Sequence, residues 1–74
     1  MQRNKKYKVS MGDPRYGNRV YGNYPAKFPE EAVEKMFAAQ EKYHPKELME
    51  AHSFHVKRGF REWEVGREGT KAVR

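Results

Sequence analysis

The chain has 74 residues, of which 36% are hydrophobic and 35% are charged. It can therefore build one small domain with a modest core. The absence of cysteine excludes a disulfide scaffold, a thiolate zinc site and a cysteine nucleophile, and it suits a reducing compartment. No apolar stretch approaches the ~20 residues of a membrane span. We expect a cytoplasmic protein with no membrane partner.

The net charge of +6 is distributed unevenly along the chain. Residues 1–27 hold seven Lys or Arg and one Asp, and residues 28–51 hold three Lys and six Glu. Residues 52–74 hold six Lys or Arg and three Glu. A basic, then acidic, then basic chain indicates an anionic partner for its basic segments. The simpler interpretation is that Lys and Arg keep a small protein soluble.

The N-terminal third predicts an arm followed by two strands. Residues 1–6 are basic and have little to bury, which predicts a flexible arm. Residues 7–11 alternate apolar and polar, the period of a half-buried strand. Residues 12–18 are rich in turn residues and predict a loop. Residues 19–24 form a second possible strand, and Pro25 predicts the end of its hydrogen-bonded pairing.

The middle of the chain predicts the main helix, which begins at Pro29. Proline suits the first helical position, and Glu30 and Glu31 suit the positive end of the helix dipole. Apolar residues then recur at helical spacing as far as Tyr43. Pro45 stops the helix at about His44. Residues 45–51 predict a short second helix.

Residues 53–65 predict a hairpin that turns at Arg58 and Gly59. Strand alternation buries Trp63 and Val65 and leaves Phe60 near the turn. Residues 67–74 predict a flexible basic tail. The order β-β-α-β-β favours a single small α+β domain over residues 7–66. We expect a two-layer fold in which one amphipathic helix packs on an antiparallel sheet of three or four strands.

A single helix would cover one face of the sheet and leave the other face open. Lys and Arg neutralise phosphates, and aromatic rings stack unpaired bases. Both kinds of residue are interleaved in the strand segments and loops. We therefore expect a non-enzymatic protein that binds RNA or DNA through a basic, aromatic-bearing sheet face and adjoining loops. The candidate binding residues are Lys8, Arg15, Tyr16, Arg19, Tyr21, Lys57, Arg58, Phe60 and Arg61.

Aromatic residues also have to build the core, because the chain has one leucine and no isoleucine. Tyr7, Phe54 and Trp63 are expected to be buried. Open sheet faces also bind proteins, so the alternative is a small interaction module that docks on an acidic surface of a larger complex. A phage-type inhibitor or an assembly subunit would fit that description. The rings expected to be exposed are Tyr16, Tyr21, Tyr24 and Phe60.

Signals for catalysis or metal binding are weak. His52 and His55 have a spacing found in metal ligands on helices, but on a strand they point to opposite faces. Ser10 and Ser53 are the only serines, and adjacency of Ser53 to histidines in sequence does not make a triad. No glycine-rich phosphate loop with a Lys-Ser/Thr pair occurs. We expect no enzymatic activity, metal, cofactor or small-molecule substrate.

Overall fold

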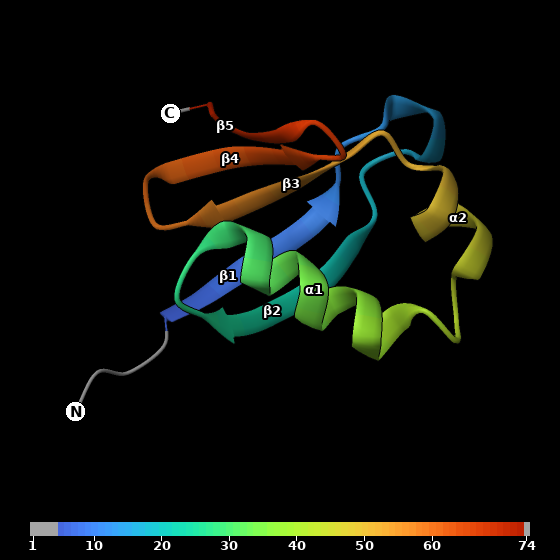
Figure 1. The fold of residues 1–74 in the computed structure, drawn as a ribbon, viewed down its shortest axis with the longest axis horizontal. Coiled ribbons are helices and arrows are strands. Elements are labelled where there is room, and N and C mark those ends of the chain that lie inside the picture. The colour runs from blue at the N-terminus through green and yellow to red at the C-terminus, as the bar shows by residue number, and fades with distance from the viewer. Residues whose placement is uncertain (1–4, 74) are drawn as a thin grey trace.

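The computed structural model describes residues 5–73, which form one five-stranded antiparallel sheet with two helices (Figure 1). The strands are β1 Lys5–Met11, β2 Val20–Ala26, β3 Ser53–Arg58, β4 Arg61–Gly66 and β5 Gly69–Ala72, in the spatial order β2-β1-β3-β4-β5. A short 3-10 helix spans Pro14–Tyr16, and helices α1 and α2 span Pro29–Gln40 and Pro45–Glu50. The predicted α+β architecture with one main helix on an antiparallel sheet is confirmed.

The sheet has five strands instead of the three or four that the sequence predicts. β5 pairs with β4 in the segment predicted to be a tail, with Ala72 opposite Trp63. Backbone hydrogen bonds to β4 order this polar segment, whose side chains are all exposed. β1 begins at Lys5, within the predicted arm, and residues 1–4 of that arm lie outside the described residues.

Pro25 lies inside β2, so the expectation that it ends strand pairing is wrong. It stands opposite Lys6, and the next residue, Ala26, still pairs with Lys5. β2 is an edge strand, where a residue without an N–H group is tolerated. The ammonium group of Lys35 on α1 donates to the carbonyl oxygen of Pro25, which ties the helix to this edge.

Helix α1 ends at Gln40, four residues before the predicted end at His44. The N–H of His44 still donates to the Gln40 carbonyl oxygen at 3.0 Å, so a further turn of chain joins α1 to α2. Tyr43 belongs to the predicted apolar stripe but is 66% exposed. The stripe that faces the sheet instead consists of Pro29, Ala32, Val33 and Met36.

The core lies between α1 and the face of the sheet that α1 covers. Tyr7, Val9, Val56 and Met36 are each at most 2% exposed. Trp63 on β4 packs against Tyr7, with ring centroids 5.6 Å apart. Aromatic rings, valines and methionine therefore fill the core in place of the leucine and isoleucine found in most cores. Neither helix of the described chain is long and apolar enough to cross a membrane.

Candidate nucleic-acid interface

The face of the sheet opposite α1, here called the open face, carries the strand residues that alternate with the core. Tyr7 and Val56 point to α1, so Lys8 and Lys57 point away from it. Lys8 stands directly opposite Lys57 in the pairing of β1 with β3, and both side chains are exposed. Like charges directly opposite each other on a sheet are destabilising. Lys6 follows the same alternation and extends this row of positive charge.

The β3–β4 turn brings two arginines to the same end of the sheet. Arg58 and Arg61 are opposed across the hairpin, which makes a second like-charged pair. Gly59 has a φ of 59°, the left-handed conformation that a tight hairpin turn requires. Phe60 follows it and is 98% exposed. We call this region the turn end, and it consists of Lys6, Lys8, Lys57, Arg58, Phe60 and Arg61.

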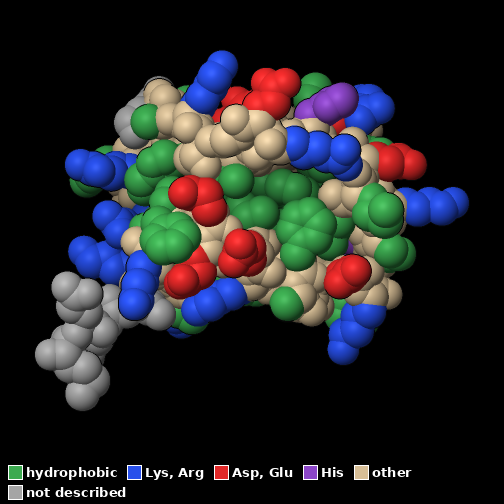
Figure 2. Space-filling model, viewed as in Figure 1, with side chains coloured by type: hydrophobic (Ala, Val, Ile, Leu, Met, Phe, Trp, Pro, Cys, Tyr) green, Lys and Arg blue, Asp and Glu red, His purple; other side chains and the backbone are tan. Residues whose placement is uncertain are grey.

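Tyr7 holds Arg58 at the turn end. The Arg58 guanidinium donates to the Tyr7 hydroxyl oxygen at 3.1 Å, and its central carbon lies 5.2 Å from the centroid of the ring. The Tyr7 hydroxyl in turn donates to the carbonyl oxygen of Lys27 at 3.3 Å. Figure 2 shows blue lysine and arginine side chains gathered at this end of the molecule, beside the start of β1.

Three cations of the turn end form no close ion pair with an acid of the described chain. Within residues 5–73, no carboxylate lies within 4 Å of the charged nitrogens of Lys8, Lys57 or Arg61. Glu62 stands opposite Lys57 in the β3–β4 pairing, but its carboxylate lies 3.5 Å from Nε2 of His55. The turn end therefore presents positive charge to solvent.

The open face carries no aromatic ring on the five described strands. Tyr7 and Tyr24 are paired on the side that α1 covers, and Phe54 and Trp63 point to that side as well. The expectation of an aromatic-bearing sheet face is therefore wrong. The physical reason is the shortage of aliphatic residues, because the rings are needed to fill the core.

The other four candidates lie at the opposite end of the sheet, in and after the loop between β1 and β2. We call this region the loop end. It begins with Asp13, which is 3% exposed and accepts a hydrogen bond from the N–H of Arg15 at 3.0 Å. The Arg15 guanidinium also donates to the Asp13 carboxylate, with Nη2 to Oδ2 at 2.8 Å, and to the carbonyl oxygen of Glu50 at 3.2 Å. These Arg15 hydrogen bonds hold the pKa of Asp13 well below its usual range.

Helix α2 supplies acidic partners to the rest of the loop end. The Tyr16 hydroxyl donates to Oε2 of Glu50 at 2.6 Å, and this acceptor raises the pKa of Tyr16. Nη2 of Arg19 lies 3.4 Å from Oε1 of Glu47. The Tyr21 hydroxyl donates to Oε2 of Glu47 at 3.3 Å. Burial, together with the Glu47 carboxylate, raises the pKa of Tyr21 to about 12.

Tyr21 is 4% exposed, so the expectation that it is exposed is wrong. The register explains why: Val9 stands opposite Gly22, whereas the next residue of β1, Ser10, stands opposite Val20. Tyr21 is the extra residue of this bulge, and it turns toward α2 while Val20 is left 53% exposed. Tyr16 and Tyr24 are half-buried. Of the four rings expected to be exposed, only Phe60 is fully exposed.

The structure thus brings five of the nine candidates together at the turn end and places four at the loop end. Sequence analysis missed Asp13 as the partner of Arg15. A signal was available, because a loop aspartate often accepts a hydrogen bond from the backbone two residues further on. It also missed the support of Arg58 by Tyr7. That contact joins residues 51 positions apart and has no local signature.

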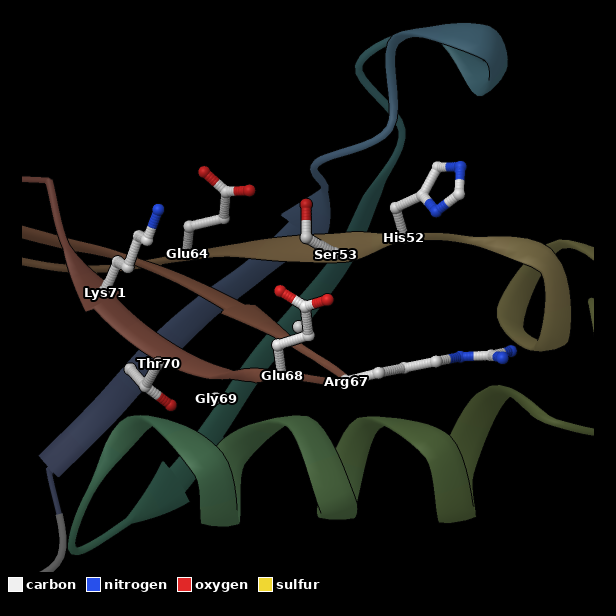
Figure 3. Close-up of a pocket in the computed structure, with 9 residues that line it drawn as sticks. His52, Ser53, Glu64, Arg67, Glu68, Gly69, Thr70 and Lys71 are labelled. Atoms are coloured by element: carbon white, nitrogen blue, oxygen red, sulfur yellow. The ribbon is translucent and has the colours of Figure 1, made fainter.

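A depression of about 580 Å³ lies on the open face beside the β4–β5 hairpin (Figure 3). His52, Ser53, Glu64, Glu68 and Lys71 line it, and in Figure 3 they point to the side away from α1. Glu64 stands opposite Lys71, so charges of both signs alternate here. No group of three or more His, Cys, Asp or Glu suited to hold a metal ion occurs within the described chain. The directly opposed lysine pair of the open face lies elsewhere, at the turn end.

Comparison of the chain with protein-family models, with curated proteins and with solved structures found no match.

Proposed function

We propose that this protein is a non-enzymatic nucleic-acid-binding protein that contacts phosphates with its turn end. The observation that carries the proposal is the directly opposed pair of Lys8 and Lys57 on the open face. Such a pair opposes folding, and a bound phosphate would relieve the repulsion. Arg61 lies at the same end of the sheet, but its side chain points to the side of α1. A cytoplasmic location, which suits a cysteine-free chain, is part of the proposal.

The geometry favours contact with the nucleic-acid backbone over recognition of bases. Phosphate contacts position a protein on nucleic acid and carry no direct sequence information. Recognition of unpaired bases uses rows of exposed aromatic rings, and the open face has none on its described strands. The turn end adds a single exposed ring, Phe60. We therefore expect binding that depends strongly on salt and little on sequence.

The decisive experiment is the substitution Lys8→Glu, which should change stability and binding in opposite directions. Glutamate would face Lys57, so the free energy of unfolding should rise by about 0.2–1 kcal/mol. Affinity for a random-sequence oligonucleotide should fall, and the slope of log K against log salt should become shallower by at least about one. Fluorescence anisotropy at several salt concentrations and urea denaturation measure the two effects.

Lys46→Glu is the matched control, because it changes the net charge equally at an exposed position on α2, outside the turn end. It should weaken binding much less than Lys8→Glu. Equal losses from the two variants, or binding that does not respond to salt, would overturn the proposal. If oligonucleotides do not bind at micromolar protein, and one acidic protein is recovered stoichiometrically after nuclease treatment, the turn end serves a protein partner.

A further inference from the structure

Helix α1 leaves an apolar groove on the side of the sheet that it covers. The groove has a volume of about 340 Å³ and lies between α1, α2 and the end of β4. Val33, Phe37, Leu48, Phe54 and Val65 are among the residues that line it. Figure 2 shows hydrophobic side chains in a hollow across the centre of this side of the molecule. The phosphate-binding proposal gives this surface no role.

The groove has an acidic rim on α1. Glu30 lies three residues before Val33. Glu34 lies three residues before Phe37, and Glu41 lies four residues after it. Residues at these spacings are neighbours on a helix, so the three glutamates form the strip next to the groove. All three are exposed, and Figure 2 shows acidic side chains beside the hydrophobic hollow. Arg67, which follows β4, also lines the groove, so the acidic rim is confined to its α1 side. The α1 side of the groove therefore suits a ligand that combines an apolar group with adjacent positive charge.

The chain itself carries such a group. Phe60 is 98% exposed at the tip of the β3–β4 turn, and Arg61 follows it directly. The apolar ring of Phe60 suits the apolar groove, and the positive charge of Arg61 suits the glutamates at its rim. We propose that Phe60 of one copy of the chain docks in the α1–β4 groove of a second copy, with Arg61 facing the acidic rim.

This contact joins two different surfaces, so a pair of copies still has one unused turn and one unused groove. A contact of this kind closes into rings or continues as a chain of molecules. Arg61 alternates with Glu62 along β4 and points to the side of α1, whereas Lys8 and Lys57 lie on the open face. Self-association therefore leaves the paired lysines accessible, and the inference does not depend on the proposed function.

Analytical ultracentrifugation without nucleic acid tests the contact. The average mass of the unmodified chain should rise above its monomer value of 8.8 kDa as concentration increases from micromolar to millimolar. Phe60→Ser removes the docking ring and should stay at the monomer mass. The double variant Glu34→Lys, Glu41→Lys reverses the charge of the rim and should also stay at the monomer mass, while it keeps Glu30 at the start of α1. Tyr43→Ser removes another exposed ring that does not line the groove and should associate like the unmodified chain.

Mixing the two monomeric variants gives the sharpest result. The Phe60→Ser chain keeps an intact groove, and the Glu34→Lys, Glu41→Lys chain keeps an intact turn. Together they should form a complex of twice the monomer mass and no larger species. The proposal fails if the unmodified chain is monomeric throughout, if Phe60→Ser still associates, or if the mixture stays monomeric. Lys8→Glu keeps Phe60, Arg61 and the groove, so it should still self-associate, and its oligonucleotide affinity tests the proposed function separately.

Discussion

The two ends of the sheet use their arginines in opposite ways. At the loop end, Arg15 and Arg19 contact the carboxylates of Asp13 and Glu47. At the turn end, Arg61 has no carboxylate within 4 Å among residues 5–73. Both ends are basic in sequence, yet only the loop end pairs its arginines with carboxylates among residues 5–73. Local composition therefore predicts where cations lie but not whether they are available.

The difference arises from what packs beside each end. Helix α2 lies next to the β1–β2 loop and brings Glu47 and Glu50 to it. Helix α1 begins near the β3–β4 turn (Figure 1), but among the described residues none of its carboxylates lies within 4 Å of a cation there. The basic residues of the loop end thus fasten a loop to a helix. Substitutions there should affect stability, and substitutions at the turn end should affect binding.

The largest expected effect on stability is at Gly12, where the loop leaves β1. A Cβ there would lie 2.9 Å from the carbonyl oxygen of Ser53 and 3.0 Å from its carbon, and both are backbone atoms. Gly12→Ala should lower the free energy of unfolding by about 2–3 kcal/mol in urea denaturation, because the crowded backbone must shift. At Gly59 nothing lies within 4 Å, and Gly59→Asn should cost less than about 1 kcal/mol. Similar losses at both glycines would contradict the proposed difference in packing.

A smaller effect should appear when the loop end is acidified. Because Arg15 lowers the pKa of Asp13 in the folded protein, the stability that this carboxylate contributes is fully present above its unfolded pKa of ~3.9. It is lost as the pH falls from about 4 toward the lower folded pKa. Asp13→Asn should be less stable than the unmodified chain at neutral pH, and the gap should shrink at about pH 3. A gap that does not change between these pH values in thermal denaturation would exclude this ion pair as a source of stability.

The smallest effects are expected at Arg19 and Arg61: the first substitution should lower stability, and the second should change binding. Arg19→Ala should lower the free energy of unfolding by at most about 1 kcal/mol, the range for a partly exposed ion pair, and leave oligonucleotide affinity nearly unchanged. Arg61→Ala should change stability by no more than about 0.5 kcal/mol and make the salt dependence of binding shallower by about one. Urea denaturation and anisotropy of both variants provide the test. Loss of binding in Arg19→Ala without loss of stability would place the interface at the loop end.

Much of the fold could be predicted because several local signals agree. Pro29 and the two glutamates after it mark the start of α1, and strand alternation identifies β1 and the β3–β4 hairpin. The strand β5 could not be predicted in this way. Its sequence, from Gly69 to Ala72, has no apolar alternation, and it is ordered by pairing with the edge of β4. The inclusion of Pro25 in β2 likewise depends on β2 being at the edge of the sheet.

The candidate site could be predicted only where strand direction determines side-chain direction. Alternation is enough to place Lys8 and Lys57 on one face, and a tight turn is enough to expose Phe60. At the loop end, the partners are 26 to 35 residues apart along the chain and meet only after α2 has packed. Neither charge counts nor periodicity contain that information. The residues whose partners on α2 could not be predicted are Arg15, Tyr16, Arg19 and Tyr21.

The edge strand β2 has a consequence for how this molecule behaves in a crowded solution. The carbonyl oxygen of Tyr21 accepts hydrogen bonds from the Tyr24 hydroxyl and the Gln40 amide, and that of Pro25 accepts one from Lys35. Pro25 also has no N–H to offer. A strand from another molecule would therefore find occupied acceptors and a missing donor along this edge, which discourages amyloid-like stacking. Side chains already bonded to the backbone thus protect this edge of the sheet from pairing with another chain.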